Sequence, residues 1–175
     1  MTYQIDPAHS AAQFKLRHMM IANVKGEFDR LSGTVDFDPA NPSAASVDVN
    51  IEVASISTRD PRRDQDMQSP RFFDAATYPS ITFKSRQVTP LGNGAFEVTG
   101  DLTLRGVTKE ISLKVNSVSD EIKDPWGNLR RGAEATARIN QSGFGMSFNA
   151  PLEGGGFMLS DAVDITLDLE MTRKP

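Results

Sequence analysis

The residues of this chain that could do chemistry are few, because it has two histidines and no cysteine. Asp6, His9 and Ser10 lie close together and supply the three side-chain types of a hydrolytic triad. A triad needs the hydroxyl within hydrogen-bond reach of the imidazole. Consecutive residues of an extended segment point to opposite faces, so His9 and Ser10 should diverge. We therefore predict a turn in which Asp6 and Ser10 satisfy backbone N–H groups, and no catalytic residue.

The second histidine, His18, continues an apolar row that begins with Ala12, Phe14 and Leu16, which places its imidazole inside the fold or at its rim. A structural role and a polar contact to a ligand headgroup both remain open for it. The spacing of the two histidines is not a ligand motif, and we predict no metal site. The glycines at 154–156 lack the Lys and Ser/Thr of a phosphate-binding loop, so no nucleotide cofactor is expected.

Charge and hydropathy exclude further classes of protein. The net charge is −4, from 23 acidic and 19 basic residues, so we expect no nucleic-acid partner. No stretch approaches the ~20 apolar residues of a membrane span. The first residues lack the basic and apolar regions of a secretory signal. The expected location is the cytoplasm for the chain as given, or the periplasm if a signal has been removed.

Runs in which every second residue is apolar extend through the whole chain. In 96–104, for example, Phe96, Val98, Leu102 and Leu104 alternate with polar residues. Such alternation is typical of half-buried antiparallel strands. We predict strands at 2–6, 11–18, 25–38, 46–54, 80–88, 95–105, 109–118, 130–140 and 162–172, with a weaker one at 143–149.

Two irregularities interrupt this pattern. The apolar parity changes between Phe28 and Leu31, which predicts a β-bulge near Asp29 and Arg30. The one long insert without strand character, 58–79, contains a predicted helix at 61–67, with Asp60 as its N-cap, and a helical turn at 70–74. We expect this insert to cap one end of the fold.

A single all-β domain over 1–175 accounts for these features, because the length fits one domain and no internal repeat is visible. Strands of this kind close into an antiparallel barrel, and an eight-stranded barrel is either filled by side chains or holds one small ligand. Small residues on the inward rows predict a hollow interior: Gly26, Gly33, Gly100, Ala133, Ala135 and Ala137.

Short fragments spread over nearly the whole chain make it similar to a known family. They include Tyr3-x-Ile5-Asp6-x-x-His9-Ser10, Ser69-Pro70-x-Phe72-Phe73-Asp74, Val98-Thr99-Gly100-x-Leu102 and Gly127-x-x-Arg130-Arg131-Gly132. Their order and spacing resemble the YceI-like family of lipid-binding, lipocalin-like barrels. The chain departs from the family pattern at Ala133, where an aromatic residue is common, and this change would widen the pore.

The resemblance implies an extended eight-stranded antiparallel up-and-down (lipocalin-like) β-barrel with a short helical insert at one end. It also implies a homodimer and a pore that holds a long isoprenoid or other lipid chain. The expected function is therefore a non-enzymatic carrier of a polyisoprenoid, an isoprenoid quinone or a fatty-acid-like lipid, with no required cofactor and at most transient membrane contact. Two alternatives remain: an enzyme that acts on a lipid at the barrel mouth, and a filled-barrel, stress-related interaction module.

Expected ligand contacts lie along the pore and at its mouth. Arg59, Arg62 and Arg63 are candidates for a phosphate headgroup if the insert caps the pore, with His18 as a neutral contact. The expected pore and mouth residues are Phe14, Leu16, His18, Met20, Ile21, Phe28, Val35, Phe37, Val49, Ile51, Arg59, Arg63, Phe72, Phe73, Phe83, Val98, Leu102, Leu113, Ala135, Phe144, Met146, Phe148 and Leu167.

Overall fold

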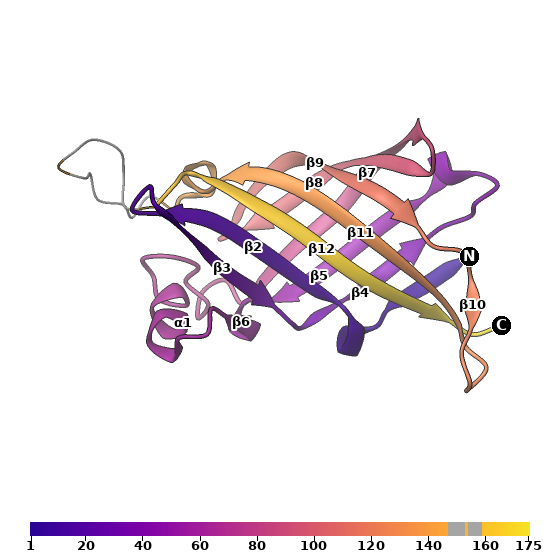
Figure 1. The fold of residues 1–175 in the computed structure, drawn as a ribbon, viewed down its shortest axis with the longest axis horizontal. Helices are drawn as coiled ribbons and strands as arrows, with labels where there is room; N and C mark the ends of the chain where they lie inside the picture. The colour runs from indigo at the N-terminus through magenta and orange to yellow at the C-terminus, as the bar shows by residue number, and fades with distance from the viewer. Residues whose placement is uncertain (147–152, 154–158) are drawn as a thin grey trace.

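The structure is a computed structural model that describes residues 1–146, 153 and 159–175, and it is built almost entirely from strands (Figure 1). The strands are β1 (Thr2–Ile5), β2 (Ala11–His18), β3 (Ala22–Phe28), β4 (Leu31–Asp36), β5 (Ser46–Glu52), β6 (Ile56–Ser57), β7 (Ser80–Gly92), β8 (Ala95–Leu104), β9 (Val107–Val118), β10 (Ile122–Lys123), β11 (Leu129–Asn140) and β12 (Ala162–Arg173). The helical elements within these residues are α1 (Pro61–Met67) and the 3-10 turns η1 (Pro7–His9), η2 (Pro42–Ala44), η3 (Val53–Ser55) and η4 (Gln141–Phe144).

The strands close into an eight-stranded antiparallel barrel. Three strands of the barrel are interrupted and consist of two segments each, namely β1 with β2, β4 with β3, and β5 with β6. Each of the eight pairs with its neighbour in sequence, from β4–β5 through β8–β9 to β11–β12. The ring closes where β12 pairs with β1 and β2. The predicted up-and-down barrel is confirmed.

The alternation in sequence corresponds to the two faces of the barrel wall. On β8, Val98, Leu102 and Leu104 are buried, whereas Glu97 is exposed. The side chains of a strand alternate between its faces, so a register with one apolar row inward leaves the other row in water. The change of parity after Phe28 is also present, because both Phe28 and Leu31 are buried and β3 stops before β4 begins.

The prediction of a strand at 143–149 is wrong for its described part. Residues 141–144 form the 3-10 turn η4, which ends at Gly145 with a left-handed φ of 75°. The Asp161 carboxylate accepts hydrogen bonds from the backbone and the hydroxyl of Ser142, at 2.9 Å each. These contacts hold the chain in a turn at the point where a strand would continue. Residues 147–149 lie outside the described part of the chain.

The glycines of the inward rows do not make the barrel hollow. A Cβ on Gly26 would lie 2.4 Å from the ring of Phe14, and one on Gly100 would lie 2.4 Å from the carbonyl oxygen of Lys84. At Gly33 the backbone φ of +141° and the Asp48 carbonyl oxygen, 2.0 Å from a Cβ, both exclude a side chain. These glycines therefore permit close packing of neighbouring strands and rings, and the prediction that they open a lumen is wrong.

The insert between β6 and β7 lies at one end of the barrel, together with the β2–β3 turn (Figure 1). As expected, Asp60 caps α1, because its carboxylate accepts hydrogen bonds from the backbone N–H groups of Arg62 and Arg63. Phe72 and Phe73 follow in a turn and are both buried. Among the described residues, no helix is both long and apolar enough to cross a membrane.

We predict that Leu102→Asp destabilises the barrel by about 4 kcal/mol, because it buries an unpaired carboxylate in the inward row of β8. The measurement is the free energy of unfolding in urea. The matched control is Thr82→Asp, which adds the same charge to the exposed face of the adjacent strand β7. Equal effects of the two substitutions would contradict the inward assignment of Leu102.

Candidate functional site

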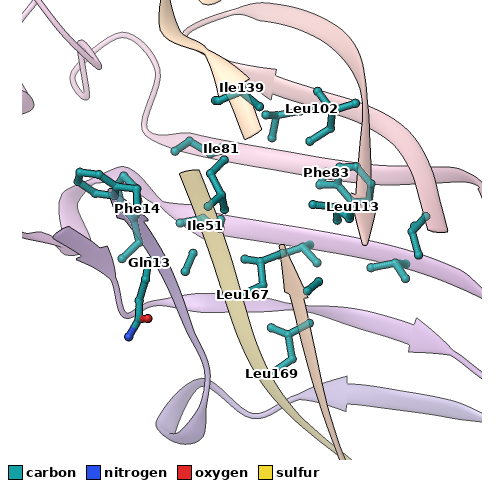
Figure 2. Close-up of a pocket in the computed structure, with 18 of the residues that line it drawn as sticks. Gln13, Phe14, Ile51, Ile81, Phe83, Leu102, Leu113, Ile139, Leu167 and Leu169 are labelled. Carbon is teal, nitrogen blue, oxygen red and sulfur yellow. The ribbon is translucent and has the colours of Figure 1, made fainter. Parts of the chain in front are cut away.

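The interior of the barrel contains a partly open cavity of about 200 Å³. Figure 2 shows inward side chains from several strands, among them Ile51, Phe83, Leu113 and Leu167, that point toward this space. All of the described lining residues are apolar except Gln13 and Gln141. Gln13 is exposed, and its amide points away from the apolar side chains. The side-chain N–H of Gln141 donates to the Ser160 carbonyl at 2.7 Å, so the interior offers a guest little beyond apolar surface.

Most of the residues predicted to lie along the pore do line this cavity. They are Phe14, Leu16, Phe28, Val35, Phe37, Val49, Ile51, Phe73, Phe83, Val98, Leu102, Leu113, Ala135, Met146 and Leu167. Ala133, where the family pattern has an aromatic residue, lines it as well. Ala137 packs against the core without reaching the cavity.

Other predicted contacts lie elsewhere. Phe72 and Phe144 are buried but do not line the cavity. His18 is half-buried at the barrel rim, where it forms an isolated bridge with Leu159. Met20 and Ile21 are exposed in the β2–β3 turn. Phe148 lies outside the described residues.

Several cavity residues were absent from the predicted set although the alternation contained them. The inward row of β12, for example, supplies Val163, Ile165, Leu169 and Met171 in addition to Leu167. These residues share the parity of Leu167, so the same signal in the sequence would have found them. Taking every residue on the inward face of a strand therefore predicts the cavity lining better than choosing only the large side chains.

The predicted headgroup cations are not on the cavity. Arg63 donates from Nε to the Thr58 hydroxyl at 2.9 Å and from Nη2 to the Thr58 carbonyl at 2.6 Å, so it fixes the start of the insert. Arg59 lies in a polar groove on the outside of the barrel, beside Lys15 and Lys25. Arg62 is exposed on α1. The structure thus places Arg59 and Arg63 away from the pore, and this part of the expected site is corrected.

A cation that the prediction missed closes the opposite end of the barrel. Arg131 shares the inward parity of Ala133 and Ala135 and is only 9% exposed. Its Nε donates to the Tyr3 hydroxyl at 2.8 Å, and its Nη1 donates to the Ser119 carbonyl at 2.7 Å. The guanidinium carbon also lies 5.5 Å from the centre of the Phe37 ring. This end is therefore closed by a buried cation with neutral hydrogen-bond acceptors.

Glu121 extends this closure to the surface. Its carboxylate accepts hydrogen bonds from the Tyr3 hydroxyl and, at 2.9 Å, from Arg173. The bond from Arg173 and then the bond from Tyr3 lower the pKa of Glu121. Glu121 therefore stays ionised and balances two nearby guanidinium groups, those of Arg131 and Arg173. Buried charge at this end is compensated without an external ion.

The turn at 6–10 has the predicted form. The Asp6 carboxylate accepts a hydrogen bond from the N–H of Ala8 at 3.0 Å, and the Ser10 hydroxyl accepts one from the N–H of Glu170 at 3.0 Å. His9 lies on the outside of the barrel, with Nδ1 3.0 Å from the Asp6 carboxylate. Ser10 is thus engaged with β12 and no triad forms among these residues.

Asp6, His9 and Glu170 are the one described group of side chains close enough together to hold a metal ion. Arg130 occupies the space between the two carboxylates, because its Nη1 lies 2.8 Å from Asp6 and also donates to Glu170. The positive guanidinium neutralises the two carboxylates, as a bound metal ion would. The group therefore behaves as an ion-pair cluster rather than a metal site.

The same guanidinium holds the loop before β11. Burial opposes ionisation of Asp124, but hydrogen bonds from Arg130, from Asn128 and from backbone N–H groups outweigh it and lower the pKa of Asp124 to about 2. The pKa of Arg130 is raised by its bonds to Asp124, Asp6 and Glu170. The pKa of Asp6 is lowered, chiefly by its bond to His9, and the pKa of His9 is raised by the same bond.

Comparison with known proteins gives a consistent result. Residues 3–171 match the family model of the YceI-like domain. A UPF0312 protein of Vibrio cholerae serotype O1 is 37% identical over 174 residues, which cover 98% of this chain and 87% of the relative. The crystal structure of BcnA from Burkholderia cenocepacia has a TM-score of 0.83 at 26% identity, over 95% of this chain and 98% of that one.

A polyisoprenoid binding domain from Saccharophagus degradans is also similar in structure. Its TM-score is 0.68 at 20% identity, over 99% of this chain and 98% of that one. At this identity the likeness concerns the fold alone.

We predict that the contribution of Arg130 to stability depends on pH. A carboxyl whose pKa is lower in the folded than in the unfolded state stabilises the fold above its unfolded pKa, near 4, and this contribution is lost as the pH falls through the folded pKa. The difference in Tm between the wild type and Arg130→Gln should therefore be largest above about pH 5 and shrink toward pH 2.

The matched control is Arg86→Gln, which removes an exposed guanidinium paired with Asp101 and Glu110. Exposed pairs contribute little to stability, so this variant should show a smaller effect on Tm at every pH. If the difference in Tm between the wild type and Arg130→Gln stayed constant from pH 7 to about pH 2, this would contradict the role of the ion-pair cluster.

Proposed function

The chain belongs to the YceI-like family, and from this starting point we propose that it is a non-enzymatic carrier that holds one long apolar chain inside its barrel. The observation that carries the proposal is the partly open cavity of about 200 Å³ inside the barrel, with its apolar lining. A cavity of roughly 150 Å³ lined by Leu, Ile and Phe already stays dry and binds an apolar guest. The interior is thus suited to hydrocarbon and offers few partners to a polar ligand.

The energetics favour a long guest over a short one. Burying hydrocarbon contributes about 0.8 kcal/mol per CH₂ group, and association costs at least about 4 kcal/mol. Burial therefore outweighs this minimum cost only when more than about five CH₂ equivalents are buried, and each further one adds about 0.8 kcal/mol. A guest with only a few such groups would not overcome the cost of association.

The shape of the interior favours a single chain. The twelve residues of β12 rise about 3.4 Å each, and with the usual tilt of barrel strands this gives a wall roughly 30 Å high. Lining residues extend from Phe37 and Met171 toward one end to Met67 and Met146 toward the other. The volume is below the roughly 300 to 1,000 Å³ of pockets for compact ligands. A narrow, elongated space of this kind accommodates a linear prenyl or acyl chain better than a fused ring system.

We base the proposed class of ligand on the apolar lining of the cavity and not on the name of a similar structure. The Saccharophagus degradans protein is named for polyisoprenoid binding, but its 20% identity shares only the fold with this chain. A polyisoprenoid, the tail of an isoprenoid quinone and a fatty-acid-like chain all present continuous hydrocarbon to the lining. Met67 and Met146 are unbranched and adapt to the contour of any of them.

The two alternatives receive less support. An enzyme at the mouth that uses both histidines requires them to converge. His9 lies in η1, before β2 begins, and His18 ends β2, so the two are separated by a strand of eight residues that spans roughly 25 Å. A filled-barrel interaction module requires a packed interior, whereas this barrel contains a cavity. The carrier proposal needs neither convergence of distant groups nor a filled core.

Native mass spectrometry of the purified protein, followed by organic extraction, tests the carrier proposal. One long-chain species per protein chain is the expected result, and extraction identifies it. Protein that arrives empty and takes up neither prenyl alcohols nor fatty acids would overturn the proposal.

We predict that Ala135→Phe weakens uptake of a long chain, because the larger side chain fills part of the cavity from the inward row of β11. The measurement is displacement of a fluorescent fatty acid, with an expected loss of affinity of about tenfold or more. The matched control is Thr136→Phe, which places the same ring on the outer face of the same strand. A folded Ala135→Phe protein that binds as the control does would contradict the proposed site.

A further inference from the structure

The β2–β3 turn lies at the end of the barrel that carries the insert (Figure 1). It exposes three consecutive apolar side chains. Met19 is 39% exposed, Met20 51% and Ile21 80%. The N–H of Ile21 donates to the carbonyl of His18 at 3.2 Å, and Met19 and Met20 have left-handed φ values of 55° and 61°. This is a tight hairpin turn of a type that normally carries Asn and Gly. Here it presents large apolar side chains to water instead.

Cations lie directly behind this turn on the outer face of the same hairpin. Lys15 and Lys25 are cross-strand partners, which sets two like charges opposite each other. Arg17 lies on the same face one step nearer the turn, opposite Asn23, and its Nη2 donates to the carbonyl of Met20 at 3.0 Å. The hairpin thus has an apolar tip and a cationic flank, although the whole chain has a net charge of −4.

Two acidic groups, Asp164 and Glu27, line the same outer groove as Lys15 and Lys25 and offset part of this positive charge. Asp164 of β12 is the cross-strand neighbour of Lys15, but Arg138 already binds its carboxylate at 2.7 Å. Glu27 lies nearer the base of the hairpin, where its cross-strand partners are Gln13 of β2 and Ser57 of β6. Arg59 from the insert lines the same outer groove and adds a further positive charge.

We propose that the β2–β3 turn docks this protein on a membrane surface that contains anionic phospholipids. Met19, Met20 and Ile21 enter the boundary between headgroups and acyl chains, and Lys15, Arg17 and Lys25 face the lipid phosphates. A second copy of this chain fits the surface less well. A two-fold contact would set the cationic flanks of two hairpins against each other.

The position of the turn connects docking with the cavity. Phe14 and Leu16 lie on the inner face of β2 and line the cavity. The residues that alternate with them, Lys15 and Arg17, face outward. Docking through the tip of β2 therefore brings one end of the apolar interior toward the bilayer. This connection rests on the proposed carrier function, whereas docking itself does not.

Flotation with lipid vesicles tests the proposal. The protein should float with vesicles of equimolar phosphatidylcholine and phosphatidylglycerol, bind phosphatidylcholine alone much more weakly, and dissociate as salt is added. The double variant Met20→Ser/Ile21→Ser should bind the mixed vesicles about tenfold more weakly. Its matched control is Ile122→Ser/Trp126→Ser, which removes exposed apolar side chains near β10, at the other end of the barrel, and should bind as the wild type does.

Charge is tested separately by Lys15→Gln/Lys25→Gln, for which we expect a loss of about tenfold or more. The control Lys84→Gln/Lys114→Gln removes the same charge from exposed positions on β7 and β9. Wild-type protein that fails to distinguish the two kinds of vesicle would overturn the proposal, as would equal binding by the tip variant and its control. A tip variant that changes the oligomeric state in solution but floats normally would assign the turn to contact between copies and would also overturn it.

Lipid uptake is measured on the same variants. The turn lies outside the cavity, so the tip variant should still take up a long chain when the chain is supplied in solution. Uptake without flotation by the wild-type protein would remove the docking proposal alone. Flotation without uptake would remove the carrier function and leave docking in place.

Discussion

The structure depends on β12, the strand that closes the barrel. One edge of β12 pairs with β11 along its whole length, from Ala162 to Arg173, and the other edge pairs with β2 and β1. Unpaired strand edges expose N–H and C=O groups, and only closure removes them. Closure also turns one face of every barrel strand inward. The apolar cavity and the polar outer surface are therefore two consequences of one set of backbone hydrogen bonds.

The two ends of this barrel are closed by different physical means. At one end, Arg131 and Tyr3 form hydrogen bonds with Ser119 and Glu121, so the closure is directional and requires each partner in place. At the other end, Met67 and Phe73 of the insert cover the cavity through apolar contact. Apolar contact is not directional and tolerates side-chain rearrangement. The asymmetry favours the insert end as the place where the interior communicates with its surroundings.

The parts of the fold that are encoded locally could be predicted from the sequence. The alternation in 96–104 gives both the strand β8 and its inward row, because the side-chain period of a strand depends only on the chain itself. The meaning of Gly26 could not be predicted, since it depends on the ring of Phe14 across the hairpin. The turn at η4 could not be predicted either, because it depends on Asp161, which lies well beyond it in sequence. The direction of the Arg59 side chain depends on how the insert packs against the barrel. Arg131 was missed although its parity placed it inside.

The closing seam also has a consequence for folding, because it joins the two ends of the chain. It pairs Gln4 with Thr172, so its contacts span almost the entire chain and carry a high entropic cost of loop closure. On the ribosome, β1 and β2 emerge long before β12 exists, and until then they lack the partner that covers their shared edge. Any barrel strands that pair before β12 arrives would leave their inward rows as an open apolar trough rather than a cavity. Protection of this nascent chain from aggregation therefore depends on whatever covers the trough before β12 arrives.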